Sequence, residues 1–153
     1  MGRLLLASLL AACSLAAQAA GPWPYDEHAD APALVTQALA AARKDHKPVL
    51  LVFGANWCPD CRALDKAMHG SSEPLIRGRF HVVKVNVGNF DTNLELSHQY
   101  GDPIRKGIPA IVVVDARGGI VYSTKGGDLA NAGQMGDQGI YDFLAQKVAP
   151  GHR

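Results

Sequence analysis

Two cysteines three positions apart, Cys58 and Cys61, are the side chains of this sequence best suited to carry out chemistry. They stand in the stretch FGANWCPDCRALD, behind a tryptophan and an apolar run that ends at Gly54. Such a pair can form a structural disulfide, supply half of a metal site, or exchange electrons as a reversible dithiol. If a helix begins at the pair, both sulfurs lie on one face of it, close enough to bond.

A helix that begins here would make the two thiols unequal. Cys58 would stand at or just before the first turn, where unpaired backbone N–H groups point at its sulfur and stabilise a thiolate. Cys61, one turn further and more buried, would be the resolving thiol that attacks a mixed disulfide. Pro59 suits a first helical turn and stiffens the linkage. Asp60 places a carboxylate beside the pair, which opposes thiolate formation and favours a poorer oxidant.

The other uses of the pair have less support. A zinc site needs two further ligands, and the six histidines are scattered singly, with no second close pair of Cys or His. Covalent haem attachment requires a histidine directly after the second cysteine, where this chain has Arg62. A purely structural disulfide over so short a loop would constrain the unfolded chain little. We therefore expect a redox pair that binds no metal and no cofactor.

The first 20 residues have the pattern of a secretory signal peptide. Arg3 is followed by an apolar Leu/Ala run and by the small-residue triplet Ala17-Gln18-Ala19. The run is short for a membrane span, and GPWPYDEHAD ends it. A competing interpretation is a lipobox, LAAC, in which Cys13 would be lipidated and become the mature N-terminus. The sequence favours soluble export to the periplasm, and a membrane-anchored lipoprotein is the alternative.

Removal of this leader changes two counts. The chain has 15 Lys and Arg against 14 Asp and Glu, and Arg3 is the one charged residue among the first 20. The remainder is formally neutral, which argues against a nucleic-acid or anionic-membrane partner found by charge. Of the three cysteines, only Cys58 and Cys61 remain, in an oxidising compartment. The one disulfide that the domain can form internally joins these two.

Hydrophobic periodicity predicts one domain in which helices and strands alternate. Helical spacing covers 32–46 and the segments SEPLIRGR, TNLELSHQYG and GIYDFLAQKV. The predicted strands are KPVLLVFG, FHVVKVNV, AIVVVD and IVYST, of which the last two form a hairpin. Residues 125–139 are predicted to be a long loop. The order predicts an α/β domain over 32–150, with a central mixed sheet between helices and a loose lead-in at 21–31.

A second motif, GIPA, leads from Gly107 directly into a predicted strand. A proline at the first residue of a strand is ordinarily an edge or turn device. Here it follows a CxxC pair in a βαβ context, and with that pair it resembles the thioredoxin superfamily. The resemblance runs from about Pro32 to Val148 and rests on WCPDC, KVNV and YGDPIRKGIPAIVVVDARGGIV. It implies the three-layer thioredoxin-like fold, a central mixed β-sheet flanked by helices.

Within the superfamily, the chain looks most like exported thioredoxin-like proteins related to the C-terminal domain of the bacterial transmembrane disulfide reductase. The resemblance implies that Trp57 covers the disulfide, that Cys58 attacks and that Cys61 resolves. It also implies a cis bond between Ile108 and Pro109 and a groove there that pairs with an extended substrate segment. Without the resemblance, Trp57 could be a core residue and Pro109 a turn residue after a trans bond.

The chain also departs from thioredoxins. Thioredoxins carry a buried aspartate in the strand before the motif, and alignment by the tryptophan and the cysteines places Val52 there. Water, Lys84 of KVNV or Asp60 would then have to manage the proton of the resolving cysteine. The approach to the proline, GDPIRKGIP, and the loop after residue 124 are longer, and either could alter the groove.

The sequence thus predicts an extracytoplasmic thiol–disulfide oxidoreductase. Its partners would be proteins with disulfides or dithiols and a second redox protein that supplies or accepts electrons. Because Asp60 disfavours the thiolate, we expect a protein disulfide reductase rather than an oxidant. A different class fits the same fold: a non-enzymatic binding module, a thiol chaperone or metal carrier, that works without turnover. Such a module would tolerate replacement of Cys61 alone, whereas the enzyme would then trap its substrate.

Overall fold

The structure is a computed structural model, and it describes residues 23–124 and 127–149. The signal peptide predicted for residues 1–20 lies outside the described residues, and so does the lipidation site predicted at Cys13. Within the described part, no helix combines the length and the apolar character that crossing a membrane requires.

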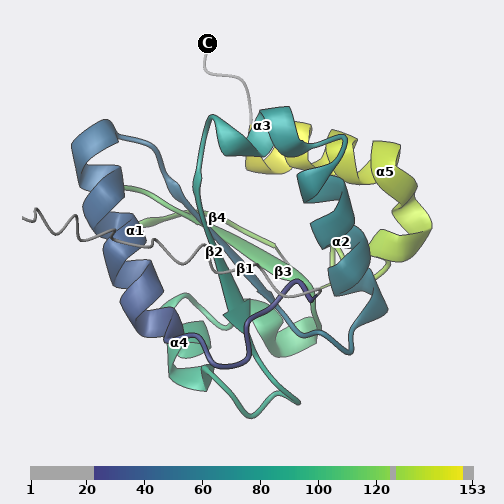
Figure 1. Ribbon diagram of the computed structural model, residues 1–153, viewed down its shortest axis with the longest axis horizontal. Helices are drawn as coiled ribbons and strands as arrows, with labels where there is room; N and C mark the ends of the chain where they lie inside the picture. Colours follow the sequence, from purple (N-terminus) through teal and green to yellow (C-terminus); the bar gives the residue numbers. More distant parts are fainter. Residues whose placement is uncertain (1–22, 125–126, 150–153) are drawn as a thin grey trace, which may run out of the picture.

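A four-stranded mixed sheet forms the centre of the molecule, with the strand order β2-β1-β3-β4 (Figure 1). β1 pairs with β2 in parallel and with β3 antiparallel, and β3 continues into an antiparallel hairpin with β4. The predicted strands and the hairpin are confirmed. Their bounds are Val49–Gly54 for β1, His81–Asn86 for β2, Ala110–Val114 for β3 and Ile120–Ser123 for β4.

Helices cover both faces of this sheet (Figure 1). α1 and α4 bury their apolar side chains against one face, and α2, α3 and α5 pack on the other. The three-layer α/β architecture that the sequence predicts is therefore confirmed. The helices are α1 (Ala31–Asp45), α2 (Pro59–His69), α3 (Glu73–Arg77), α4 (Leu94–Gln99) and α5 (Ala132–Phe143), with a 3₁₀ turn η1 (Pro103–Lys106) and a π-helical turn η2 (Leu144–Val148).

Strand β1 is buried along its whole length because both of its faces are covered. Leu51 and Phe53 belong to the core on the α1 side, whereas Leu50 and Val52 belong to the core beneath α2 and α5. Successive side chains of a strand point to opposite faces, so a central strand needs apolar residues at every position. The unbroken run PVLLVFG satisfies this requirement, and it fixes the strand whose end leads to the cysteines.

Two segments are more ordered than the sequence indicates. Helix α5 begins at Ala132, inside the segment 125–139 that we predicted to be a loop, so that prediction is wrong for its second half. Gly136, with φ 67° and ψ 174°, interrupts the helical geometry, and such glycines hide a helix from pattern analysis. The lead-in is not loose either, because Tyr25 is only 2% exposed and packs in the core on the α1 side.

The hairpin between β3 and β4 depends on one carboxylate. Asp115 accepts hydrogen bonds from the backbone N–H groups of Arg117, at 2.8 Å, and Gly119, at 2.9 Å. Gly118 supplies the left-handed conformation of the turn, with φ 91°. The hydrogen bonds from Gly119 and then Arg117 hold the pKa of the Asp115 carboxyl below its ordinary value. The ionised side chain therefore stabilises the turn.

Replacing Asp115 by Ala should lower stability in a manner that depends on pH. Because the folded pKa lies below the unfolded one, the stabilisation is present above the unfolded pKa, about 4, and disappears as the pH falls through the folded pKa. The difference in free energy of unfolding between wild type and Asp115→Ala, measured by urea denaturation from pH 6 down to pH 3, should shrink in acid. A difference that stays constant or grows would contradict this role.

Candidate redox site

Cys58 and Cys61 form a disulfide at the N-terminal end of α2, with their Cα atoms 5.2 Å apart. Cys58 is the N-cap of α2, and its Sγ accepts a hydrogen bond of 3.1 Å from the backbone N–H of Cys61. Pro59 is the first helical residue. Cys58 is 3% exposed and Cys61 is fully buried. A helix terminus thus points an N–H group at the Cys58 sulfur, the arrangement that favours a thiolate there once the bond is reduced.

The loop before β3 closes over this disulfide. The Ile108–Pro109 bond is cis, as the resemblance implies. The carbonyl oxygen of Ile108 lies 3.7 Å from Cys58 Sγ, and both loop residues are buried. The structure therefore brings the two motifs, CxxC and GIPA, into contact. Whether Ile108 and Pro109 shape a substrate groove stays a prediction about their role.

Trp57 lies at the rim of the site and not in the core, since it is 52% exposed. Its indole Nε1 donates a hydrogen bond of 2.8 Å to the carbonyl of Gly88, in the loop after β2. Phe90 of the same loop meets the indole edge to face, with ring centroids 6.1 Å apart, and is 44% exposed. Phe90 also adopts a left-handed backbone, with φ 63°. The sequence analysis missed Phe90, although its neighbours in VGNFDTN are typical of a tight loop.

Asp60 is turned away from the cysteines toward α5. Its Oδ1 accepts a hydrogen bond of 2.8 Å from the backbone N–H of Gly133, in the first turn of that helix. This bond and the positive end of the α5 dipole partly neutralise the carboxylate. Asp60 therefore opposes a thiolate on Cys58 or Cys61 less than its position in the sequence indicates.

Among the described residues, the recorded contacts of Lys84 are with Asp65 and Tyr25 and not with the cysteines. It forms an ion pair with Asp65, one helical turn after Cys61, and the two side chains are 19% and 21% exposed. Its ammonium group lies 5.4 Å from the centre of the Tyr25 ring. The sequence analysis named Lys84 but missed both partners, because 19 residues separate Lys84 from Asp65 and Tyr25 lies in the lead-in.

Val52 occupies an apolar environment and has no acidic substitute there. It is 1% exposed and packs in the core that includes Leu64 and Ile111. A polar group beside the buried cysteine comes instead from Tyr25, because a Cβ atom on Gly54 would meet both the Tyr25 hydroxyl and Cys61 Sγ. The polar group near the buried cysteine therefore comes from the lead-in, whereas in thioredoxins an aspartate of this strand supplies it.

Asn56, in the turn between β1 and the cysteines, fastens the lead-in to the site. Its Oδ1 accepts from the backbone N–H of Tyr25 at 3.0 Å, and its Nδ2 donates to the Tyr25 carbonyl at 2.9 Å. The same Nδ2 donates to Glu27 at 3.0 Å. Arg62 of α2 donates to the Asn56 carbonyl at 2.6 Å. The lead-in, the turn and the start of α2 thus form one hydrogen-bonded unit.

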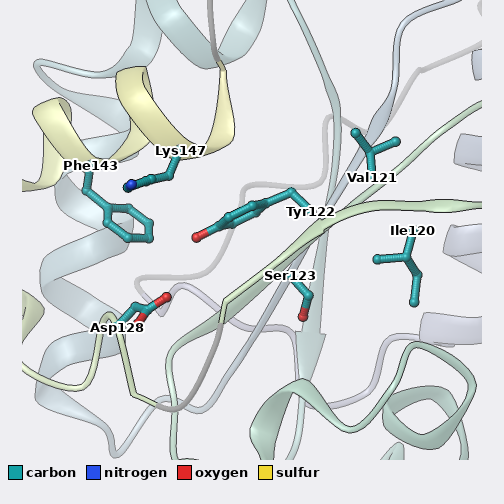
Figure 2. Close-up of a pocket in the computed structure, with 7 residues that line it drawn as sticks. All are labelled: Ile120, Val121, Tyr122, Ser123, Asp128, Phe143 and Lys147. Atoms are coloured by element: carbon teal, nitrogen blue, oxygen red, sulfur yellow. The ribbon is translucent and has the colours of Figure 1, made fainter.

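We also looked for a metal site and for a pocket elsewhere on the molecule. Residues 23–124 and 127–149 contain no group of three or more His, Cys, Asp or Glu side chains placed to hold a metal ion. A hollow along the edge strand β4 is shown in Figure 2, where Tyr122 reaches toward Phe143 and Lys147. Cys58 and Cys61 are not among the residues that line it, so it is not the candidate redox site.

Comparison with known proteins identifies the family. The sequence model of the thioredoxin-like family matches residues 31–116. The chain belongs to the thioredoxin-like family. With its CxxC disulfide at the start of α2, this member of the family is a thiol–disulfide oxidoreductase. The superfamily that the sequence analysis named is therefore confirmed.

Among solved structures, one is similar to this chain at high sequence identity and two others at low identity. The crystal structure of a disulphide isomerase from Xylella fastidiosa Temecula1 is 62% identical, with a TM-score of 0.80, over 83% of this chain and 98% of that one. The oxidised C-terminal domain of DsbD from Neisseria meningitidis is 26% identical over 64% of this chain and 84% of its own, with a TM-score of 0.47. Trxlp from Edwardsiella tarda EIB202 is 26% identical over 80% and 96%, with a TM-score of 0.49. No curated protein sequence matched the chain.

Replacing Asn56 by Ala should destabilise the protein by about 1–3 kcal/mol, because the N–H and carbonyl of Tyr25 lose their partners. Urea denaturation gives the free energy of unfolding, and hydrogen exchange at the Tyr25 amide should become faster. Asn89→Ala, an exposed asparagine of the loop after β2, is the matched control and should change stability by less than about 0.5 kcal/mol. Equal effects of the two substitutions would contradict a stabilising role for the Asn56–Tyr25 hydrogen bonds, which we call the Asn56–Tyr25 clamp.

Proposed function

We propose that this protein is an exported protein disulfide reductase in which Cys58 is the nucleophile and Cys61 the resolving thiol. The observation that carries the proposal is the hydrogen bond from the Cys61 N–H to Cys58 Sγ at the start of α2. It distinguishes the two sulfurs, because the helix terminus stabilises negative charge on Cys58 only. The contact of Cys58 with the Ile108 carbonyl places the attacking sulfur beside the GIPA loop.

The reaction is two successive thiol–disulfide exchanges. The Cys58 thiolate of the reduced protein attacks one sulfur of a substrate disulfide, that S–S bond breaks, and the other substrate sulfur leaves and takes a proton from solvent. Cys61 then loses its proton and attacks Cys58 Sγ in the mixed disulfide, which releases the second substrate thiol. Two electrons pass to the substrate, and Cys58–Cys61 is oxidised. A second dithiol protein regenerates the pair by the same exchange.

Substrate contact is proposed at the rim formed by Trp57, Phe90 and the Ile108–Pro109 loop. The two aromatic rings are about half exposed and are held by the Gly88 hydrogen bond and by each other. Exposed aromatic surface beside a reactive sulfur suits apolar side chains of an extended protein segment. Proteins are therefore the proposed substrates.

We propose that the protein reduces disulfides, and the support for this direction is the Xylella relative rather than Asp60. The Asp60 carboxylate bonds to Gly133, so its opposition to a thiolate is reduced. The Xylella relative is called a disulphide isomerase, and isomerisation starts with attack by a free thiolate. A similar activity in this chain would require that Cys58 and Cys61 be kept reduced by a donor.

Export is proposed from the sequence of residues 1–20. Cleavage near residue 20 and a periplasmic location are supported by the basic start, the apolar run and the A-x-A site. The exported domain would then span residues 32–150. Retention as a lipoprotein through Cys13 is the alternative. An oxidising compartment makes the electron donor necessary, because the pair would otherwise remain a disulfide.

Replacing Cys61 by Ser should trap substrates. With no resolving thiol, the mixed disulfide on Cys58 accumulates, and non-reducing gels with mass spectrometry of periplasmic extracts should show covalent adducts that reductant releases. Cys58→Ser is the matched control and should form none. If Cys61→Ser captures no protein, the redox proposal fails. A phenotype that survives Cys61→Ser unchanged would favour the non-enzymatic binding module.

The reduction potential should separate a reductase from an oxidant. Equilibration with glutathione buffers, read from the fluorescence or the mass of alkylated protein, should give a value near that of thioredoxin, about −270 mV. Dedicated protein oxidants lie near about −120 mV because their reduced form is stabilised. A value close to the second figure would overturn the reductive direction while leaving the exchange chemistry intact.

A further inference from the structure

The hydroxyl of Tyr25 is a buried polar group that the proposed mechanism leaves without a role. Tyr25 is 2% exposed, and its hydroxyl has no hydrogen-bond partner within residues 23–124 and 127–149. Most buried hydroxyls in proteins are paired, because an unpaired one loses its bonds to water and gains nothing in return. Its position beside the redox pair therefore requires an explanation.

The hydroxyl lies next to the sulfur of the buried cysteine. A Cβ atom on Gly54 would overlap the Tyr25 hydroxyl oxygen and would lie 3.0 Å from Cys61 Sγ. The phenol oxygen and the sulfur thus border the same small space at the end of β1. The backbone of Gly54 does not adopt a positive φ, so the glycine is needed for this close approach and not for its conformation.

Several contacts hold the ring in this position. The Asn56 side chain fixes the Tyr25 backbone through two hydrogen bonds, at 3.0 and 2.9 Å. Lys84 lies over the ring, at 5.4 Å from its centre. Burial, and secondarily the charge of Asp65, raises the pKa of Tyr25 above its ordinary value. The phenol is therefore protonated at neutral pH, and its hydroxyl is available there as a neutral donor.

We propose that Tyr25 is a positioning residue for Cys61, whose hydroxyl donates a hydrogen bond to the Cys61 sulfur when the pair is reduced. The inference rests on the proposed function. In the disulfide, Cys61 Sγ is bonded to Cys58 and the hydroxyl has no partner. Reduction by two electrons breaks that bond and leaves Cys61 as a thiol or thiolate, which accepts a hydrogen bond better than a disulfide sulfur does. The lead-in then supplies the polar group that Val52 does not.

The charged side chains next to Tyr25 are Lys84, which lies over its ring, and Asp65, whose charge acts on its hydroxyl. The two form an ion pair with each other, so their charges offset. A neutral phenol adds a directional bond without adding charge. Because that bond forms in the reduced state only, it shifts the dithiol–disulfide equilibrium toward the dithiol. It also raises the fraction of Cys61 present as the thiolate that resolves the mixed disulfide.

Tyr25→Phe removes the hydroxyl and keeps the ring. Its equilibrium with glutathione should move about tenfold toward the disulfide, which corresponds to a potential about 30 mV more negative. The rate at which Cys61 displaces glutathione from Cys58 at neutral pH should fall as well. Tyr122→Phe, at a partly buried residue of β4 that packs against the core on the opposite side of the sheet, is the matched control and should leave both quantities unchanged. A Tyr25→Phe potential equal to that of wild type overturns the inference.

A second measurement does not depend on the folding of that variant. Uniform replacement of tyrosine by 3-fluorotyrosine makes the phenol a stronger donor, so the potential should move in the opposite direction, toward a less negative value. An unchanged or more negative value overturns the inference. Both measurements use glutathione and need no protein substrate. Failure of the inference therefore shows as an unchanged potential, whereas failure of the proposed function shows as an empty Cys61→Ser trap.

Discussion

The hydrogen bond from the Cys61 N–H to Cys58 Sγ is the interaction on which the whole site depends. It exists only because α2 begins directly after Cys58, with Pro59 as its first residue. The helix begins there because β1 ends at Gly54, and β1 is fixed by burial on both of its faces. The large apolar core thus determines where a single backbone N–H points. The chemistry of the pair follows, since that N–H favours charge on one sulfur and not on the other.

Gly54 imposes the second constraint. A side chain at this position would collide with the Tyr25 hydroxyl and crowd Cys61, so the end of β1 must be bare. The space that it leaves open is filled from outside the βαβ unit, by a residue of the lead-in that Asn56 holds in place. The segment before α1 is consequently part of the redox site, and its loss would remove a polar group from the neighbourhood of the resolving cysteine.

The charged residues that the sequence places near the pair, Asp60 and Lys84, have partners other than the cysteine sulfurs. Asp60 stands between the cysteines in sequence but bonds to the start of α5, while Lys84 is paired with Asp65 across α2 and β2. Both charges are therefore largely compensated by partners other than the sulfurs. What remains beside the cysteines is the backbone N–H of Cys61, a neutral donor to Cys58 Sγ, and the phenol that we propose as a second neutral donor. Such donors stabilise a thiolate without attracting a competing counter-ion.

The sequence by itself determined the strands, most of the helices, the unequal cysteines and, through GIPA, the family. These features are local. The apolar run PVLLVFG predicts a strand buried on both faces, and CPDC predicts the start of a helix. Only the tertiary structure decided that Tyr25 meets Cys61, that Asp60 meets Gly133 and that Phe90 meets Trp57. The Asp60 contact spans 73 residues and the Asn56–Tyr25 clamp spans 31. Hydrophobic periodicity carries no information about which distant polar groups meet, because packing of the complete chain selects those partners.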